Sequence, residues 1–338
     1  MKSPGKTAVN IGIVGDGGWG TALALLLREN GHRVTVWGPF PDYIKAVVQS
    51  RENSLYLPGV QLPEDIRWTS DRRDAVAHAH VAILASPTKF FRSVVESFAS
   101  LIPPSCTILS VAKGLDPKTH QRMTEVAEEV LRRSPVAALS GPSLAPEVAR
   151  GIPTAVVVAS RDEKQSRELQ VLFSSSRFRV YTSDDRIGVE LGGALKNIIA
   201  LAAGISDGLG FGDNTRAALM TRGLAEITRL GVALGAGAAT FSGLSGAGDL
   251  IVTCTSRLSR NHAVGERIGR GETAAQIMAD MKQVAEGLWN CTVARDLARR
   301  VNVEVPIIEQ VCAVVHEGRN PMDALVSLMT RETKPEMG

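Results

Sequence analysis

The pattern G-x-G-x-x-G, in the string Gly15-Asp16-Gly17-Gly18-Trp19-Gly20, constrains the fold of this chain more than any other feature. The string follows a short apolar run, Val9–Val14, and precedes a helix-like segment, Thr21–Asn30. In this context the glycines permit a tight turn and a close approach of the backbone to a pyrophosphate, which the helix N-terminus then faces. The strand and helix around the pattern make it much more specific than a glycine-rich turn alone. The sequence therefore predicts a dinucleotide-binding turn formed by Gly15, Gly17, Gly18, Trp19 and Gly20.

Details of this turn leave the identity of the dinucleotide open. Asp16 places a carboxylate beside the expected pyrophosphate, so its side chain should point away from the phosphates. Trp19 either lines the nucleotide or packs beneath the loop. The second apolar run ends in Trp37-Gly38-Pro39-Phe40, without the acidic residue that binds the ribose of NAD or the arginine that accommodates the 2′-phosphate of NADP. Pro39 matches neither pattern, and the cofactor is NAD or NADP.

Short apolar runs alternate with amphipathic segments through the first half of the chain. The runs are continuous, which is typical of strands buried on both faces of a parallel sheet. Strands are predicted at Val9–Val14, Val34–Trp37, Val81–Ala85, Thr107–Val111, Val136–Leu139 and Ala155–Ala159. Helices are predicted at Thr21–Asn30, Arg72–Ala79, Lys89–Leu101, Gln121–Arg132 and Glu163–Phe173. This alternation predicts an α/β fold with a doubly wound parallel sheet and right-handed crossovers.

From about Glu190 the composition changes. Ala, Gly and Leu dominate, strand-like runs nearly vanish, and helical periodicity continues to about Thr330. A chain of 338 residues is also long for one compact domain. We therefore expect a dinucleotide-binding domain over residues 1–188 and an all-α domain over residues 189–338.

Composition and charge narrow the class of function. Lys plus Arg exceed Asp plus Glu by only 38 − 35 = 3, so neither nucleic acid nor an anionic membrane is indicated as a partner. The longest apolar runs, such as Ala22–Leu27 and Ile198–Ala203, are too short to span a bilayer. The histidines show no metal-ligand spacing, and no metal is expected. The cysteines form no CxxC pair and are interpreted as reduced thiols of a cytoplasmic protein; they are Cys106, Cys254, Cys291 and Cys312.

Four further strings carry chemistry-bearing residues. Lys113 lies in Ala112-Lys113-Gly114-Leu115, directly after the fourth predicted strand, where doubly wound sheets place ligand contacts. Ser140-Gly141-Pro142-Ser143 follows the fifth. The other two strings are Glu190-Leu191-Gly192-Gly193-Ala194-Leu195-Lys196-Asn197, at the start of the helical half, and Gly246-Ala247-Gly248-Asp249-Leu250, followed by Thr253, Ser259-Arg260-Asn261 and Val284-Ala285-Glu286-Gly287.

With these strings, the chain resembles the bacterial NAD(P)-dependent glycerol-3-phosphate dehydrogenases from about Val9 to Ser327. Asn53, Tyr56-Leu57-Pro58-Gly59 and Ser206-Asp207-Gly208 add to the resemblance. It implies a Rossmann domain followed by a helical domain, and reversible hydride transfer between NAD(P)H and dihydroxyacetone phosphate. The product, sn-glycerol 3-phosphate, would serve phospholipid synthesis. The family is commonly dimeric, so a homodimer is expected.

The resemblance also implies catalytic roles. Lys196 is the acid/base, a role that its apolar, glycine-rich surroundings suit because burial lowers the pKa of a lysine. Lys113 polarises the substrate oxygen as negative charge develops on it. Asp249 holds the substrate and orients Lys196, although an aspartate after Gly-Ala-Gly also suits a helix cap.

The substrate carries a phosphate, which needs hydrogen-bond donors. By resemblance these are the guanidinium of Arg260, with Ser259 and Asn261 beside it. Gly141 and Ser143 resemble further substrate contacts. The residues expected toward the cofactor are Lys113, Arg260, Ala145, Val284 and Glu286.

Two other functions are weighed against this one. Another two-domain dehydrogenase, acting on a different hydroxy acid or a β-hydroxyacyl group, would not need the group Ser259-Arg260-Asn261. A sensor that binds the dinucleotide without catalysis would not need Lys196, Lys113 and Asp249 together.

Overall fold

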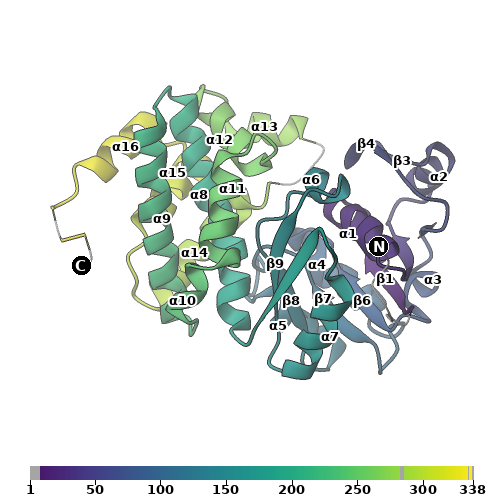
Figure 1. Ribbon diagram of the computed structural model, residues 1–338. Helices are drawn as coiled ribbons and strands as arrows, with labels where there is room; N and C mark the ends of the chain where they lie inside the picture. The colour runs from purple at the N-terminus through teal and green to yellow at the C-terminus, as the bar shows by residue number, and fades with distance from the viewer. Residues whose placement is uncertain (1–7, 282–284, 334, 337–338) are drawn as a thin grey trace.

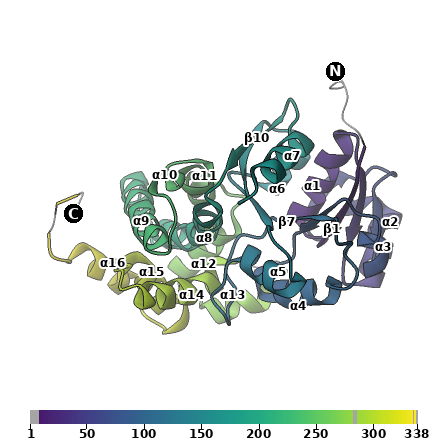
Figure 2. The same cartoon turned by 90° about the horizontal axis from the view of Figure 1, so that it is seen from below.

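The computed structural model describes residues 8–281, 285–333 and 335–336. A sheet-containing half and a helical half lie side by side in both views (Figure 1; Figure 2). The main sheet has the strand order β10-β9-β8-β7-β6-β1-β2-β5. Its strands are β1 (Asn10–Val14), β2 (Arg33–Trp37), β5 (Arg67–Thr69), β6 (Val81–Leu84), β7 (Thr107–Ser110), β8 (Ala137–Ser140), β9 (Thr154–Ala159) and β10 (Phe178–Ser183).

Helices cover both faces of this sheet, as a doubly wound fold requires. One apolar cluster joins the sheet to residues of α1 and α7, and a second joins the sheet to residues of α3, α4 and α5. The predicted fold class is thereby confirmed. The helices of this half are α1 (Gly18–Glu29), α2 (Pro41–Ser50), α3 (Arg72–Val76), α4 (Thr88–Phe98), α5 (Met123–Leu131), α6 (Ala145–Ala149) and α7 (Glu163–Phe173).

Two strands depart from the expected all-parallel arrangement, because β9 and its parallel neighbour β10 run opposite to the rest of the sheet. β9 pairs antiparallel with β8 through Leu139 and Val158, while the other pairs of this sheet are parallel. The connection between β8 and β9 contains only α6, a helix of five residues. Parallel strands are usually joined through a full helix, whereas the five residues of α6 form little more than one turn, so the chain turns back as an antiparallel strand.

Several elements of the first half were not predicted from the sequence. They include a small antiparallel pair, β3 (Glu52–Asn53) with β4 (Leu57–Gln61), which lies beside the glycine-rich turn. Asn53 connects the two regions, because its Nδ2 donates to the backbone oxygen of Asp16 and to Thr21 Oγ1, both at 2.7 Å. This explains why Asn53 accompanies the glycine motif in the sequence.

The second half is helical and is built around α8 (Arg186–Gly208), which lies in the centre of the apolar cluster of this half. By length and composition α8 could cross a membrane, but its most apolar window is 94% buried inside the molecule, as expected of a core helix. Around it lie α9 (Asp213–Ala233), α10 (Ala238–Phe241), the π-helical turn η1 (Leu244–Gly248), α11 (Asp249–Thr255), α12 (Arg260–Gly269), α13 (Ala274–Asp280), α14 (Gly287–Arg300), α15 (Pro306–His316) and α16 (Pro321–Met329).

Glycines allow α8 and α12 to pack in backbone contact. A Cβ on Gly204 would lie 2.1 Å from the carbonyl oxygen of His262, and a Cβ on Gly265 would lie 2.2 Å from that of Leu201. Real Cβ atoms do not approach so closely, so these positions accept only glycine without movement of a helix. The two helices form the most extensive contact of the helical half.

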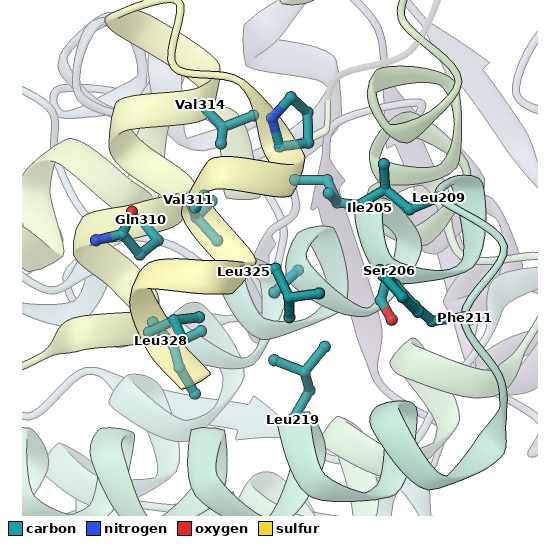
Figure 3. Close-up of a pocket in the computed structure, with 14 residues that line it drawn as sticks. Ile205, Ser206, Leu209, Phe211, Leu219, Gln310, Val311, Val314, Leu325 and Leu328 are labelled. Carbon is teal, nitrogen blue, oxygen red and sulfur yellow. The ribbon is translucent and has the colours of Figure 1, made fainter. Parts of the chain in front are cut away.

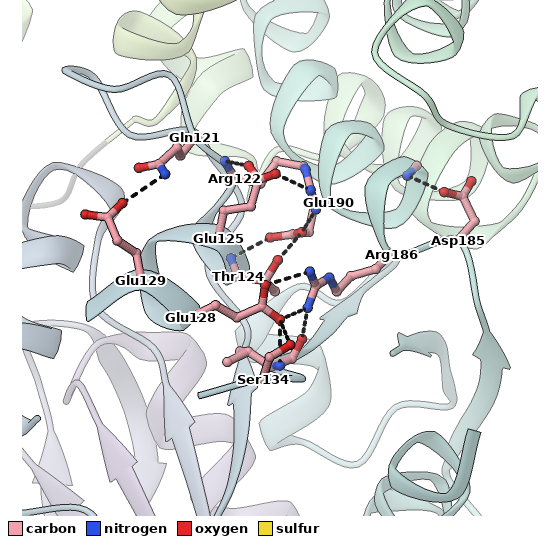
Figure 4. Close-up of polar contacts among 12 residues, drawn as sticks. Gln121, Arg122, Thr124, Glu125, Glu128, Glu129, Ser134, Asp185, Arg186 and Glu190 are labelled. Carbon is pink, nitrogen blue, oxygen red and sulfur yellow. Dashed lines mark hydrogen bonds and ion pairs between the residues drawn. The ribbon is translucent and has the colours of Figure 1, made fainter. Parts of the chain in front are cut away.

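A buried polar network fastens the first turns of α8 to α5, in the other half of the molecule (Figure 4). Glu190 accepts from Arg122 Nη1 at 2.6 Å and from the backbone nitrogen of Thr124 at 2.9 Å. Arg186 is 1% exposed and donates to both carboxylate oxygens of Glu128. Because each ion is paired, the network fixes the start of α8 against the sheet-containing half.

Candidate active site

The loop after β7 places Lys113 at the junction of the two halves. Its ammonium group donates to Gly141 O and to Asp249 Oδ2, both at 2.8 Å, and lies 3.3 Å from Ser143 Oγ. Gly141 and Ser143 follow β8, the strand next to β7, so neighbouring carboxyl ends of parallel strands bring these residues together. Asp249 comes from the helical half, and its contact with Lys113 therefore connects the halves.

Lys196 projects from α8 toward the same carboxylate. Its Nζ donates to Asp249 Oδ1 at 2.8 Å and to Thr253 Oγ1 at 2.6 Å. Burial lowers the pKa of Lys196 to about 8; Lys113 lowers it further, and the Asp249 carboxylate acts in the opposite direction. A lysine with this pKa exchanges a proton near neutral pH, as a general acid/base must.

The glycines of the string around Lys196 explain how α8 reaches the site. A Cβ on Gly193 would lie 2.5 Å from Ser140 Oγ, and a Cβ on Gly192 would lie 2.6 Å from the carbonyl oxygen of Ser245. Ser140 ends β8 and Ser245 lies in η1, so α8 packs directly on both. The turn η1 in turn sets the start of α11, where Asp249 is 1% exposed.

Thr253 belongs to this cluster and was not among the predicted site residues. Its hydroxyl accepts from Lys196 and donates to the backbone oxygen of Asp249 at 2.6 Å. Thr253 lies four residues after Asp249 on α11, so both side chains lie on one helix face. That spacing was the available signal in the sequence.

The group Ser259-Arg260-Asn261 begins α12. Ser259 is the N-cap of this ten-residue helix, and its Oγ accepts from the backbone nitrogen of His262 at 3.2 Å. The side chain of Arg260 is exposed, with Glu286 as a charged neighbour. An exposed guanidinium at a helix N-terminus is a favourable site for a phosphate.

Asn261 is placed differently from Arg260. Its Nδ2 donates to Asn197 Oδ1 and its Oδ1 accepts from the backbone nitrogen of Gly287, both at 2.9 Å. Asn197 in turn donates to the backbone oxygen of Lys113 at 3.2 Å. The amide of Asn261 thus belongs to a chain of hydrogen bonds from α14 through α12 and α8 to the Lys113 loop.

The glycine-rich turn fits a dinucleotide pyrophosphate. Gly15 has φ +131°, and its Cβ would lie 2.8 Å from the backbone of Ala85, so only glycine suits the turn. A Cβ on Gly20 would lie 2.2 Å from the carbonyl oxygen of Gly15, where α1 packs on β1. Among the described residues, nothing lies within 4 Å of the Cβ position of Gly17, and the first turn of α1 contains no acidic residue. An open backbone at a helix N-terminus without a competing acid is suited to bind an anion.

The other residues expected near the cofactor lie in different surroundings. Ala145, at the start of α6, is 3.8 Å from the Cβ position of Gly18. Trp19 is half-buried and packs against the apolar cluster between the sheet and α1. Glu286 accepts from the backbone nitrogen of Thr88 at 3.0 Å and also from its hydroxyl, which connects the helical half to α4. Val284 lies outside the described residues.

A separate apolar pocket lies further along α8 (Figure 3). Ser206 lines it and lies ten residues after Lys196, a distance of about 15 Å along a helix. Within the part of the chain that the structure describes, its lining contains no titratable side chain, and no group of three His, Cys, Asp or Glu residues could hold a metal.

Comparisons with known proteins agree with this geometry. Residues 10–166 match the family model of the NAD-dependent glycerol-3-phosphate dehydrogenase N-terminus, and residues 185–326 match that of its C-terminus. A glycerol-3-phosphate dehydrogenase (NAD(P)+) of Syntrophotalea carbinolica is 49% identical over 97% of this chain and 100% of its own length. The enzyme of that name from Geobacillus kaustophilus is 48% identical over 97% of this chain and 96% of its own length.

A solved structure supports the same assignment. The crystal structure of glycerol-3-phosphate dehydrogenase from Coxiella burnetii is similar with a TM-score of 0.92 and 39% identity, and it covers 96% of this chain and 99% of its own. A ketopantoate reductase from Ralstonia eutropha, at 15% identity and a TM-score of 0.60, shares the fold alone. The chain belongs to the NAD-dependent glycerol-3-phosphate dehydrogenase family.

Proposed function

We propose that this protein interconverts dihydroxyacetone phosphate and sn-glycerol 3-phosphate, and that its cellular use is to supply glycerol 3-phosphate for phospholipid synthesis. The observation that carries the proposal is the cluster of Lys113, Lys196 and Asp249, in which residues from the two halves of the molecule meet. The proposal is further supported by the family to which the chain belongs. The nicotinamide cofactor, NAD or NADP, supplies or accepts the hydride at C2 of the substrate.

Lys196 moves the proton of the C2 oxygen. In reduction its ammonium group donates a proton to the oxygen, and in oxidation the neutral amine removes the proton of the C2 hydroxyl. With a pKa of about 8 both forms of Lys196 are populated near neutral pH. Asp249 and Thr253 hold Nζ at 2.8 and 2.6 Å, which restricts the direction in which the proton is delivered.

Lys113 stabilises the negative charge that develops on the substrate oxygen. Its contacts with Gly141 O and Asp249 Oδ2 fix the ammonium group before substrate binds, so little reorganisation is needed. Ser143, whose Oγ lies 3.3 Å from the same ammonium group, is a further contact for substrate.

The phosphate of the substrate binds at the N-terminus of α12. Arg260 provides a charged pair of donors and Ser259 begins the helix whose positive end faces the anion. Asn261 supports this region by connecting α12 to Asn197 and Gly287. We propose that Asn261 fixes the position of Arg260 relative to the Lys113 loop and also contacts the substrate.

Cofactor contacts are proposed for the glycine-rich turn and for the residues around it. The open backbone at Gly17 and the uncapped start of α1 support a pyrophosphate site there, with Gly15, Gly18, Trp19 and Gly20 around it. Further contacts to the cofactor, on the side that faces the substrate, are proposed for Lys113, Ala145, Arg260, Val284 and Glu286. In this proposal residues 1–188 form the dinucleotide-binding domain and residues 189–338 form the helical substrate-binding and catalytic domain, and both domains contribute residues to each ligand.

A homodimer and a cytoplasmic location are also proposed, on the basis of the family alone. Light scattering of the purified protein after gel filtration distinguishes a dimer from a 36.0 kDa monomer.

The test of the function is the oxidation rate of NADH, and separately of NADPH, on addition of dihydroxyacetone phosphate. Rapid oxidation of either nucleotide is the expected result. If both nucleotides bind and neither is oxidised, this substrate is wrong, and other hydroxy acids and β-hydroxyacyl compounds are the next candidates. If nothing is turned over, a dinucleotide sensor becomes the better hypothesis.

A further inference from the structure

The Asp16 side chain lies beside the end of β2. A Cβ built on Gly38 would lie 2.4 Å from Asp16 Oδ2, so the carboxylate packs directly against the backbone that follows Trp37. The pairing of β1 with β2 explains this position, because Val14 pairs with Trp37 and the segments that follow these two residues continue side by side. The side chain therefore points away from the expected pyrophosphate and toward the place where the adenosine ribose lies in this fold.

This place normally has an acidic residue of β2 itself, which accepts a hydrogen bond from the ribose of NAD. In this chain Trp37, Gly38, Pro39 and Phe40 provide none. Gly38 has no side chain, and that absence leaves the space which the Asp16 carboxylate occupies. A carboxylate is thus present at the end of β2, although it comes from the loop after β1.

One oxygen of this carboxylate lacks a protein donor. Asp16 is 6% exposed, and among the described residues its Oδ2 has no hydrogen-bond partner. Burial raises the pKa of Asp16 to about 6, although the backbone N–H of Asp16 acts in the opposite direction. A buried carboxylate oxygen without a donor is costly, and a hydroxyl donor from outside the protein would relieve that cost.

We propose that Asp16 replaces the missing acid of β2: its carboxylate accepts a hydrogen bond from the 2′-hydroxyl of the adenosine ribose and excludes a 2′-phosphate. The protein is then selective for NAD over NADP. This inference rests on the proposed function, since it concerns the cofactor of the same site. The 2′-phosphate of NADP is a dianion, and Asp16 would repel it in a partly dehydrated site where electrostatic interactions are strong.

Direct binding of NADH and NADPH, followed by nucleotide fluorescence without substrate, tests the inference. The wild type should bind NADH roughly 10- to 100-fold more tightly than NADPH, the range for one hydrogen bond to a charged group. Asp16→Asn should reduce this ratio by at least about tenfold, with tighter NADPH binding as the larger part of the change. Asp16→Ala should also reduce the preference for NADH over NADPH.

Asp42→Asn is the matched control. Asp42 lies five residues after the end of β2, and its side chain is 100% exposed, with Lys45 Nζ at 3.7 Å from its Oδ1. The ratio of the two dissociation constants should be unchanged in this variant. Thermal unfolding of each variant establishes that it is folded, and Asp16→Ala provides a second measurement should Asp16→Asn unfold.

The outcomes separate this inference from the proposed function. If the wild type binds both nucleotides equally, or if both Asp16 variants keep the wild-type ratio, Asp16 does not select the cofactor while the dehydrogenase activity stands. If Asp42→Asn changes the ratio and the Asp16 variants do not, the ribose acid is Asp42. Failure of the wild type to bind either nucleotide would overturn the proposed function itself.

Discussion

The ammonium group of Lys196 lies 2.8 Å from Oδ1 of Asp249, deep in the contact between α8 and α11. The other oxygen of the same carboxylate accepts from Lys113, also at 2.8 Å, so one acid separates two lysines that come from different halves of the chain. Without Asp249 the two cations would repel each other in a site where burial already opposes charge. The position of Lys196, the proposed acid/base, therefore depends on how the two halves are assembled.

Replacing Lys196 by methionine should abolish turnover while leaving the cofactor site intact. Lys196→Met removes the proton donor and keeps a side chain of similar length, so kcat should fall by about 10²- to 10⁴-fold, the contribution of a general acid/base. NADH affinity, measured by fluorescence, should be unchanged. Lys164→Met is the control, because Lys164 is exposed on α7. Undiminished turnover in Lys196→Met would show that another group moves the proton.

The two directions of the reaction should depend on pH in opposite ways. Burial holds the pKa of Lys196 near 8, so Lys196 is mostly protonated below this pH and mostly neutral above it. The kcat/KM for dihydroxyacetone phosphate reduction should fall as pH rises through about 8, and that for glycerol 3-phosphate oxidation should rise. Asp249→Asn removes the carboxylate that raises this pKa, so the midpoint of its residual activity should move to lower pH. Parallel profiles in both directions would contradict the assignment of Lys196.

The fold class and the cofactor turn could be predicted because their signals are local. Continuous apolar runs identified the inner strands, and the family resemblance is confirmed by the matched models. β10 was not predicted because the strands were identified from continuous apolar runs, and β10 is an edge strand that alternates buried and exposed residues, with Arg179 and Tyr181 exposed. β5 has three residues, too few for a pattern.

The assembly of the site could be predicted only in part, because its contacts join distant parts of the sequence. The four-residue spacing of Thr253 from Asp249 places the two side chains on one helix face, but it does not reveal the contact of Thr253 with Lys196 across 57 positions. Asn261 was expected toward the substrate, yet its amide contacts Asn197 and Gly287. The position of the Asp16 carboxylate depends on the space left by Gly38, a relationship between two strands that appears only when β1 and β2 are paired.

The buried ion pair of Arg186 and Glu128 should contribute strongly to stability. Their side chains are 1% and 17% exposed, and the shortest contact is 2.5 Å. Glu128→Gln leaves a buried guanidinium without its counter-charge, which should lower the free energy of unfolding by about 3 kcal/mol. Urea denaturation measures this change. Glu163→Gln removes an exposed pair with Arg167 on α7 and should have little effect. Equal losses of unfolding free energy in Glu128→Gln and Glu163→Gln would contradict the larger contribution expected of the buried pair.

Alanine at Gly265 should destabilise the protein although alanine favours helices. The added Cβ would meet the carbonyl oxygen of Leu201 at 2.2 Å, so α12 must move away from α8. Overpacking of this kind costs about 1–3 kcal/mol, more than the roughly 1 kcal/mol that alanine gains over glycine within a helix. Because α8 carries Lys196, kcat should fall as well. At Gly212, the N-cap of α9, nothing described lies within 4 Å of the Cβ position, so Gly212→Ala should lose only the preference of an N-cap for glycine over alanine and leave kcat unchanged.

Glu226 should make stability fall as pH rises from about 4.5 to about 7. Its carboxylate is 1% exposed and accepts from the backbone nitrogens of Ile307 and Ile308, at the start of α15, at 2.9 and 2.8 Å. Burial raises its pKa from 4.5 to about 7 despite these donors. A folded pKa above the unfolded one means that the native state binds the proton more tightly, so this contribution is complete below pH 4.5 and is lost as pH approaches 7.

Glu226→Gln removes this titration and isolates its contribution. The difference in unfolding free energy between wild type and Glu226→Gln, measured by urea denaturation at several pH values, should shift against the wild type by on the order of 3 kcal/mol between pH 4.5 and 7. Glu332→Gln, at an exposed acid near the C-terminus, should keep the pH dependence of the wild type. A difference that stays constant, or moves in favour of the wild type as pH rises, would mean that the two backbone donors outweigh burial and keep Glu226 ionised in the native state.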